Sequence, residues 1–239
     1  LRELKLTSFD DYYALVTSRS QGNHPELEHL LNAITTNKTS FFRESHHFDV
    51  LRRCVVAPSA EAGGQPKLRI WSAGCSTGEE PYSILMTICE ALPHWEGADV
   101  RVLASDLDSE VLATGERGVY PREHTDELPA ELRRRWFIEG SGNQRALVRV
   151  RRALRERVAF RRINFVEPDW PVRVRFDAIF CRNALIYFDS ETQRTVVGRL
   201  LSYLLPNGYL FLGHSESMAG ARPELKSLGR TAYQYLGEP

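Results

Sequence analysis

The sequence contains few cysteines, and none of them lies in a metal-binding or redox pattern. Cys54, Cys75, Cys89 and Cys181 are the only four among 239 residues, and no two are arranged as C-x-x-C. We therefore expect no metal site, and thiols that stay reduced, as in the cytoplasm. The sequence also lacks an apolar run long enough for a secretory signal or a transmembrane helix, so we expect no membrane insertion.

The sequence also has no net charge at neutral pH. The 31 lysines and arginines are balanced by 31 aspartates and glutamates. A general nucleic-acid binder usually carries a clear basic excess. The composition therefore predicts no nucleic-acid partner.

The most informative stretch is residues 71–81, because it lies between a strand pattern and a helix pattern. Residues 68–71 are typical of a short buried strand, and apolar residues recur at helical spacing from Tyr82 to Cys89. Glycines at 74 and 78 let the backbone approach a ligand closely. The pattern predicts the nucleoside-binding turn of an α/β sheet.

This loop lacks the two common phosphate-binding patterns. Neither G-x-G-x-x-G nor G-x-x-x-x-G-K-[ST] is present, and the loop ends in two acids, Glu79 and Glu80. Carboxylates would repel phosphates but suit a cationic ligand. S-adenosylmethionine carries a sulfonium and an ammonium group, so we predict it as the cofactor.

Asp106 follows the next strand pattern, residues 100–105. An α/β fold often places there the carboxylate that holds a ribose diol. Aspartate is also a favoured helix N-cap, so the position alone leaves both roles open. Together with the acid at Glu79 in the preceding loop, the position of Asp106 favours the ribose-binding role over the helix-cap role.

The chain divides into a helical part and an α/β part. Apolar spacing predicts helices from Phe9 to about Val56, so residues 1–58 are expected to form a small N-terminal helical domain. Residues 59–66 have the small residues, proline and glycines of a linker. Further strands are predicted at 158–165, 176–182, 209–212 and 232–236, alternating with helices, which gives residues 67–239 a mainly parallel, Rossmann-like sheet.

Residues 133–162 interrupt this alternation with eleven arginines against two acids. Val148 and Val150 alternate with Arg149 and Arg151, which is typical of a half-exposed strand. We predict a small antiparallel β insertion with an arginine-rich face. The face is either a solvated surface or a docking site for an acidic or peptide partner.

Five ordered motifs across nearly the whole chain resemble the CheR family of chemotaxis receptor methyltransferases. They are N-K-T-S-F-F-R-E (37–44), G-C-S-T-G-E-E-P-Y-S (74–83), A-S-D-L-D (104–108), C-R-N-A-L-I-Y-F-D (181–189) and G-H-S-E-S (213–217). The resemblance implies an S-adenosylmethionine-dependent protein-glutamate O-methyltransferase acting on the cytoplasmic helices of chemoreceptors. It also implies that the β insertion docks on receptors, including a receptor C-terminal tail. Ala184 departs from the family, which often has valine there.

The resemblance assigns roles to particular residues. Arg43 would pair with the cofactor carboxylate, Asp106 would hold the ribose, and Tyr187 would lie nearest the transferred methyl, which makes Tyr187 and Arg43 the catalytic candidates. The full set of implied cofactor contacts is Asn37, Thr39, Arg43, Glu79, Asp106, Asn164, Phe165, Asn183 and Ala184. For each asparagine, a turn or cap role remains the alternative.

The reaction explains why the sequence shows no catalytic triad. A glutamate side chain has a pKa of about 4.3 and is already ionised at neutral pH, so no general base is required. His46, His47 and His214 are therefore expected to be structural. Two alternative functions remain. The first is a nucleic-acid methyltransferase, which the neutral net charge and the lack of an N-P-P-Y-type motif disfavour. The second is a non-catalytic scaffold that binds S-adenosylmethionine.

Overall fold

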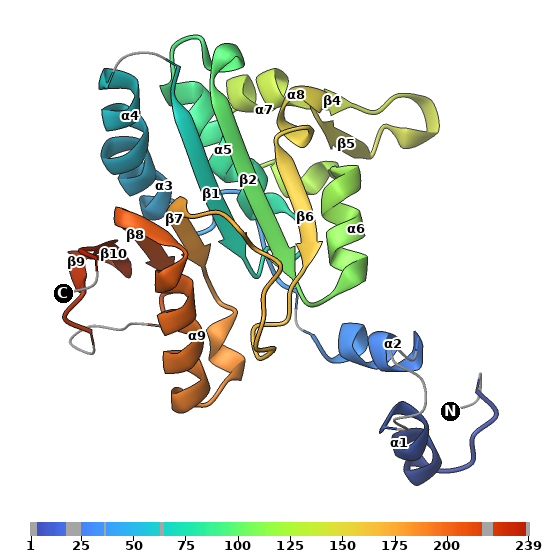
Figure 1. The fold of residues 1–239 in the computed structure, drawn as a ribbon. Helices are drawn as coiled ribbons and strands as arrows, with labels where there is room; N and C mark the ends of the chain where they lie inside the picture. The colour runs from blue at the N-terminus through green and yellow to red at the C-terminus, as the bar shows by residue number, and fades with distance from the viewer. Residues whose placement is uncertain (1–3, 18–24, 36, 63–64, 217–221, 238–239) are drawn as a thin grey trace.

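The computed structural model describes residues 4–17, 25–35, 37–62, 65–216 and 222–237. Over these residues the chain has the predicted α/β fold, with a large central sheet, helices on both of its faces and a small second sheet (Figure 1). The α-helices are α1 (Phe9–Thr17), α2 (Pro25–Ile34), α3 (His46–Leu51), α4 (Ala57–Glu61), α5 (Glu79–Ala91), α6 (Ser109–Arg117), α7 (Ala130–Trp136), α8 (Arg152–Arg155) and α9 (Ser190–Ser202). The π-helical turn is η1 (Arg52–Val56), and the 3-10 turns are η2 (Trp95–Gly97), η3 (Arg122–Thr125), η4 (Gly142–Gln144) and η5 (Leu185–Tyr187).

The central sheet has seven strands in the order β6-β2-β1-β7-β8-β10-β9. They are β1 (Lys67–Ala73), β2 (Asp99–Asp106), β6 (Val158–Arg162), β7 (Phe176–Cys181), β8 (Leu204–Leu212), β9 (Leu225–Gly229) and β10 (Ala232–Tyr235). The five strands from β6 to β8 in this order are parallel, whereas β10 and β9 are antiparallel to their neighbours. The carboxyl ends of β1, β2, β6 and β7 therefore meet at one edge, where an α/β sheet binds its ligand.

Alternating side chains of β1 face two separate cores. Leu68 and Ile70 pack with α5 on one face, and Trp71 and Ala73 pack with α9 on the other. A strand that is buried on both faces needs apolar residues on both, and in β1 these are Leu68, Ile70 and Trp71, which is why the strand could be predicted.

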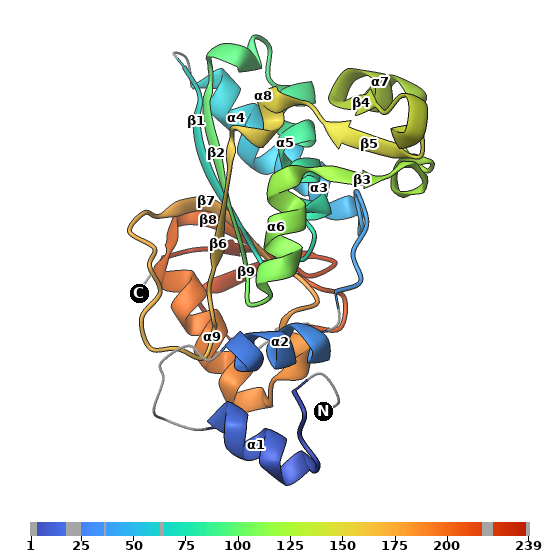
Figure 2. The ribbon, with the colours of Figure 1, turned by 90° about the vertical axis from the view of Figure 1, so that its right-hand side faces the viewer.

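A small antiparallel sheet has the order β3-β5-β4, with β3 (Val119–Pro121), β4 (Phe137–Glu139) and β5 (Leu147–Val150). Figure 2 shows it near one end of the molecule, with α1 and α2 at the other. The prediction of an insertion at 133–162 has the wrong limits. The small sheet begins at Val119, and β6, at 158–162, belongs to the central sheet.

The predicted linker at 59–66 is wrong at its start, because α3, η1 and α4 form one uninterrupted helix through Glu61. The π-helical turn η1 directly precedes Pro58, whose ring removes a backbone donor, so the change of helix type lets the helix continue past the proline. Phe48, Leu51 and Val56 are buried in the same core as α5. Gly63 and Gly64 of the predicted linker lie outside the described residues.

Among the described residues, no helix has the length and apolar character that crossing a membrane would require.

Candidate functional site

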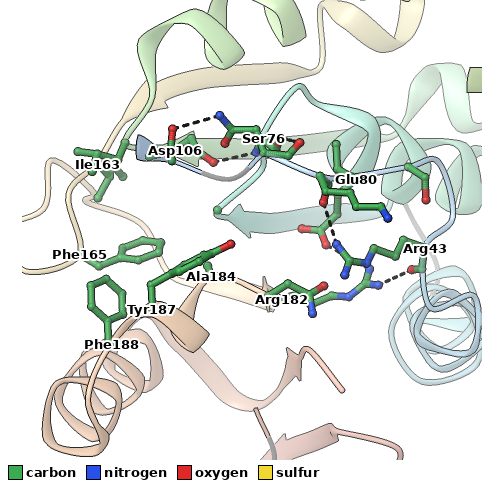
Figure 3. Close-up of a pocket in the computed structure, with 18 of the residues that line it drawn as sticks. Arg43, Ser76, Glu80, Asp106, Ile163, Phe165, Arg182, Ala184, Tyr187 and Phe188 are labelled. Carbon is green, nitrogen blue, oxygen red and sulfur yellow. Dashed lines mark hydrogen bonds and ion pairs between the residues drawn. The ribbon is translucent and has the colours of Figure 1, made fainter. Parts of the chain in front are cut away.

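A cavity of about 310 Å³ lies at the carboxyl edge of the central sheet (Figure 3). Its walls come from the segment that follows α2, from the loop between β1 and α5, and from the residues after β2, β6 and β7. Figure 3 shows Arg43, Glu80 and Arg182 toward one end, Asp106 and Ile163 toward the other, and Tyr187 between them. The cavity therefore has a charged end and a mixed acidic and apolar end.

The structure brings nearly all of the predicted site residues to this cavity. Those that line it are Asn37, Thr39, Arg43, Asp106, Asn164, Phe165, Asn183, Ala184 and Tyr187. Glu79 is not among the lining residues, and Glu80 takes its place.

Glu79 and Glu80 point in different directions because consecutive helix residues are about 100° apart around the axis. Glu79 is buried and accepts a hydrogen bond from Thr77 Oγ1 at 2.6 Å, while its Oε1 lies 3.2 Å from His124 Nδ1. Glu80 instead accepts from Ser72 Oγ at 2.7 Å and pairs with Arg182 at 3.1 Å. In this structure Glu79 thus holds the loop and Glu80 faces the cavity, and a direct contact between Glu79 and the cofactor stays a prediction.

Asp106 lies at the end of β2 and points into the site. Its Oδ2 accepts from Ser76 N at 2.8 Å and its Oδ1 from Asp108 N at 3.1 Å. Burial raises the pKa of Asp106, although these backbone donors act in the opposite direction. The N-cap of α6 is Asp108, whose carboxylate accepts from the backbone of Glu110 and Val111. The alternative of a helix cap therefore applies to Asp108 and not to Asp106.

Asp108 also fastens the segment after α2, of which residues 35 and 37–43 are described and which we call the lid segment. Its Oδ2 accepts from Thr35 Oγ1 at 3.0 Å and from Asn37 Nδ2 at 2.7 Å. Ser76 Oγ donates to the Asn37 carbonyl at 3.0 Å. The lid segment is thus bonded to the loops after both β1 and β2, and Asn37 has a structural role in addition to its place in the cavity wall.

Phe41 connects the lid segment to the small sheet. Its ring is buried and makes edge contacts with Tyr120 and Phe137, each with ring centroids 5.2 Å apart. Tyr120 in turn donates from its hydroxyl to the Thr77 carbonyl at 2.8 Å. The small sheet therefore contacts both the lid segment and the loop between β1 and α5.

Arg182, directly after β7, was not predicted as a site residue. It lines the cavity and is largely buried, donates to the Arg43 carbonyl, and pairs with Glu80. A second carboxylate, Glu44, lies 3.7 Å away. Arg43 itself donates from Nη1 to the Lys38 carbonyl at 2.9 Å. The C-R-N motif was the available signal, because a buried arginine beside a strand end usually requires acidic partners.

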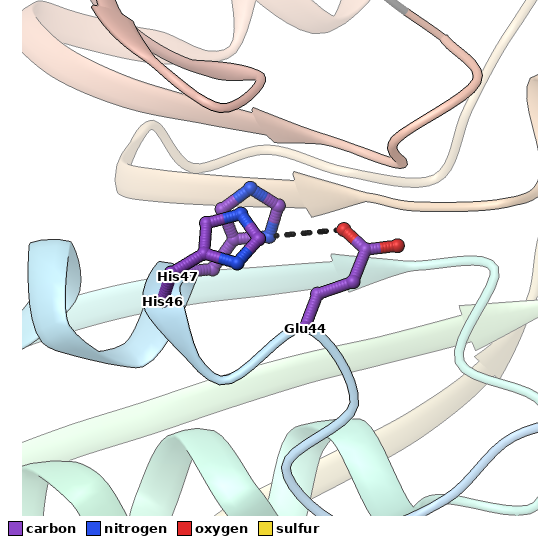
Figure 4. Close-up of side chains that lie close together, drawn as sticks. All are labelled: Glu44, His46 and His47. Atoms are coloured by element: carbon purple, nitrogen blue, oxygen red, sulfur yellow. Dashed lines mark ion pairs between the residues drawn. The ribbon is translucent and has the colours of Figure 1, made fainter.

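Glu44, His46 and His47 form a cluster behind this ion pair (Figure 4). Both histidines direct Nε2 to the Arg230 carbonyl, at 3.1 and 2.9 Å, and His47 Nδ1 lies 3.5 Å from Glu44 Oε2. Burial, together with the Arg182 guanidinium, lowers the pKa of His47 to about 3. Arg182 already supplies the positive charge beside Glu44. The arrangement therefore favours a structural role for the two histidines, which hold the turn before β10, over a cation site.

The turn after β7 approaches the loop after β1 closely. A Cβ atom on Gly74 would lie 2.7 Å from Ala184 Cβ, and Gly74 has a φ of +87°, which favours glycine. Asn183 has a φ of 58°, in the left-handed region that asparagine tolerates. The position of Ala184 therefore requires glycine at 74.

The arginine-rich face of the small sheet follows the predicted alternation. Val148 and Val150 are buried, whereas Arg149 and Arg151 are exposed. β5 is the central strand, so β3 and β4 are the edges of the small sheet.

The cysteines are unpaired, and Cys75, Cys89 and Cys181 are buried. Burial raises the pKa of each of these three thiols, so none of them is a ready nucleophile.

Comparison with known proteins identifies the family. Residues 37–234 match the family described as "CheR methyltransferase, SAM binding domain". The chain belongs to this family. The chain is therefore an S-adenosylmethionine-dependent methyltransferase.

Individual relatives are similar over most of their length. The chain is 44% identical to chemotaxis protein methyltransferase 2 of Pseudomonas aeruginosa over 233 residues, covering 98% of this chain and 80% of the relative. It is 41% identical to the chemotaxis protein methyltransferase of Escherichia coli, covering 98% and 78%. Among solved structures, a protein named "putative rRNA-methylase" from Clostridium thermocellum aligns with a TM-score of 0.43 and 11% sequence identity. The alignment covers 84% of this chain and 95% of that chain.

Proposed function

We propose that the protein transfers a methyl group from S-adenosylmethionine to glutamate side chains on the cytoplasmic helices of chemoreceptors. The observation that carries the proposal is the family match over residues 37–234 together with a cavity whose wall includes an exposed Tyr187. The relatives in Pseudomonas aeruginosa and Escherichia coli are named chemotaxis methyltransferases. Because the proposed substrate helices are cytoplasmic, the proposal also implies that the protein acts in the cytoplasm.

The cavity residues fit the proposed cofactor. Asp106 supplies the carboxylate for the ribose diol, and Ile163 and Phe165 supply apolar surface for the adenine at the same end. Arg43 supplies a cation for the cofactor carboxylate, and Glu80 an anion for its ammonium. The backbone after β7, at Asn183 and Ala184, frames the middle of the cavity.

The bound cofactor supplies a methyl group made electrophilic by its sulfonium, and the transfer leaves a neutral thioether. The substrate carboxylate is ionised at neutral pH, since its pKa is about 4.3, and needs no base from the protein. The task of the protein is to hold the oxygen in line with the methyl and to exclude water. Orientation of this kind contributes about 7–11 kcal/mol in favourable cases. Tyr187, at 61% exposure on the cavity wall, is the side chain placed to meet the incoming glutamate.

The decisive experiment measures methyl transfer to a purified receptor cytoplasmic fragment from cofactor labelled in the methyl group. We expect label in the fragment that is released by mild base, as methyl esters are, and none in a fragment whose acceptor glutamates are replaced by glutamine. Binding of S-adenosylhomocysteine without any methyl transfer would instead support a non-catalytic scaffold. Label in nucleic acid but not in receptor would contradict the proposal.

A further inference from the structure

One buried carboxylate from the C-terminal part of the chain holds the turn that follows β7. Glu216 is 4% exposed. Its Oε2 accepts from Asn183 N and from Gly213 N, each at 2.7 Å, and its Oε1 accepts from Leu185 N at 2.6 Å. The three donors come from two loops that are about thirty residues apart in the sequence.

The N–H groups of Asn183 and Leu185 lie beyond the end of β7 at Cys181, and Glu216 accepts a hydrogen bond from each. Asn183 has a left-handed φ of 58°, which asparagine tolerates but most other residues do not. A buried N–H group left without an acceptor is costly, and a carboxylate that receives several backbone N–H groups binds them more strongly than a neutral acceptor does. The conformation of this turn therefore depends on the side-chain oxygens of Glu216.

The turn matters because of what it carries. Asn183 and Ala184 line the cavity, and η5, which begins at Leu185, ends at Tyr187. We infer that Glu216 is a positioning residue of the cofactor site: it sets the turn that presents Asn183, Ala184 and Tyr187 to S-adenosylmethionine. It does not itself line the cavity.

Gly213 is the steric counterpart of this contact. A Cβ atom there would lie 2.6 Å from Glu216 Oε2, 2.6 Å from Asn183 Nδ2 and 2.7 Å from Asn183 N. Separations this short force something to move. A methyl group at Gly213 would therefore displace the same turn while leaving the charge of Glu216 in place.

The test is the affinity of folded variants for S-adenosylhomocysteine, measured by calorimetry without any methyl acceptor. Glu216→Gln keeps the shape of the side chain, but its amide nitrogen must face at least one backbone N–H. We expect the dissociation constant to rise about tenfold or more, the loss expected for one charge-assisted hydrogen bond. Glu224→Gln is the matched control, because Glu224 pairs with Arg222 and does not line the cavity, so its affinity should equal that of the wild type.

A purely structural role would lower thermal stability but leave the affinity of the folded protein unchanged. Measurements well below the unfolding midpoint separate the two, and NMR adds a second readout. The amide protons of Asn183, Leu185 and Gly213 should shift together in Glu216→Gln, since all three lose a carboxylate acceptor.

Gly213→Ala and Glu216→Asp decide the question if Glu216→Gln does not fold. Each should weaken cofactor binding, the first by displacing the turn and the second by shortening the reach of the carboxylate. Wild-type affinity in any folded variant of Glu216 would overturn the inference. Because no acceptor is present, that result would leave the proposed glutamate substrate untouched, whereas absence of receptor methylation would leave this inference untouched.

Discussion

Asp106 faces two opposing demands. Burial raises the pKa of its carboxyl group, so the ionised form costs stability in the folded protein, yet the ribose diol requires that carboxylate as an acceptor. Such a conflict is typical of a functional position, where a residue is kept for its chemistry and not for stability.

We predict that Asp106→Ala weakens binding of S-adenosylhomocysteine by about 1.5–3 kcal/mol, the range for a hydrogen bond to a charged group. Calorimetry measures the affinity, and circular dichroism verifies that the variant is folded. Unchanged affinity in a folded Asp106→Ala protein would show that Asp106 only holds the backbone of Ser76 and Asp108.

His47 gives a prediction about acid sensitivity. Its imidazole is buried against Glu44, His46, Arg182 and the Arg230 carbonyl, and its pKa is lowered from 6.5 to about 3 by burial first and Arg182 second. A depressed pKa contributes stability that is complete above the unfolded value of 6.5 and is lost as the pH falls toward 3.

Between about pH 7 and about pH 5, His47 should therefore account for about 2 kcal/mol of the lost free energy of unfolding. Urea unfolding at both pH values should show a smaller loss in His47→Gln than in the wild type. His214→Gln, at an exposed position, is the control and should behave like the wild type. An equal loss in all three proteins would contradict a buried neutral His47.

Most of the residues that line the cavity were predicted because their motifs resemble those of the CheR family, and those after β2, β6 and β7 also lie at strand ends. The sequence could not distinguish Glu79 from Glu80, since both are acids at one helix start and only the helix rotation decides which faces the cavity. Arg182 and Glu216 were missed as site residues for a related reason. Their partners, Glu80 for the first and the turn at 183–185 for the second, are distant in sequence and become neighbours only in the fold.

At the scale of elements, the small sheet offers an arginine-bearing surface whose role we infer to be receptor docking. Arg149 and Arg151 are exposed beside the buried Val148 and Val150, so they contribute little to the packing of the sheet. Exposed charges of this kind act through long-range attraction, which salt screens over about 8–10 Å.

Reversing Arg149 and Arg151 to glutamate should raise the KM for receptor and leave cofactor affinity unchanged. The wild-type advantage should fade as ionic strength rises. Arg52 and Arg53, exposed on η1, provide a control pair whose reversal changes the net charge equally. Equal methylation rates for all proteins at limiting receptor, at low and high salt, would show that Arg149 and Arg151 form only a solvated face.

Elements with a regular apolar pattern could be predicted, and those without one could not. Among the central strands, β1, β2 and β7 each carry several buried apolar residues and were identified. β9 is mostly exposed and has no alternation, so it was missed. Residues 59–61 of α4 were read as the start of a linker because small and polar residues fill them, and none of the residues of α4 is buried, so no apolar pattern marks this helix.

At the scale of the whole molecule, the helix through α3 and α4 and the central sheet share one hydrophobic core. The lid segment is also bonded to the loops after β1 and β2. A ligand that contacts the lid segment and the strand ends should therefore stabilise these parts together.

We predict that S-adenosylhomocysteine, at about 100 times its dissociation constant, raises the free energy of unfolding by about 2.7 kcal/mol in a single transition. Denaturant unfolding with and without ligand measures this increase. Asp106→Ala at the same ligand concentration should gain less. Two separate transitions, of which only one responds to the ligand, would show that the helical part and the sheet unfold independently.

The contacts of Phe41 have a thermodynamic consequence. Its ring belongs to the lid segment yet packs on Tyr120 and Phe137 of the small sheet, and Tyr120 also bonds the loop between β1 and α5. Any partner that displaces these rings on docking changes the affinity for cofactor by some factor. Linkage then requires that cofactor change the affinity for that partner by the same factor, so methyl donor supply and partner occupancy would each report on the other.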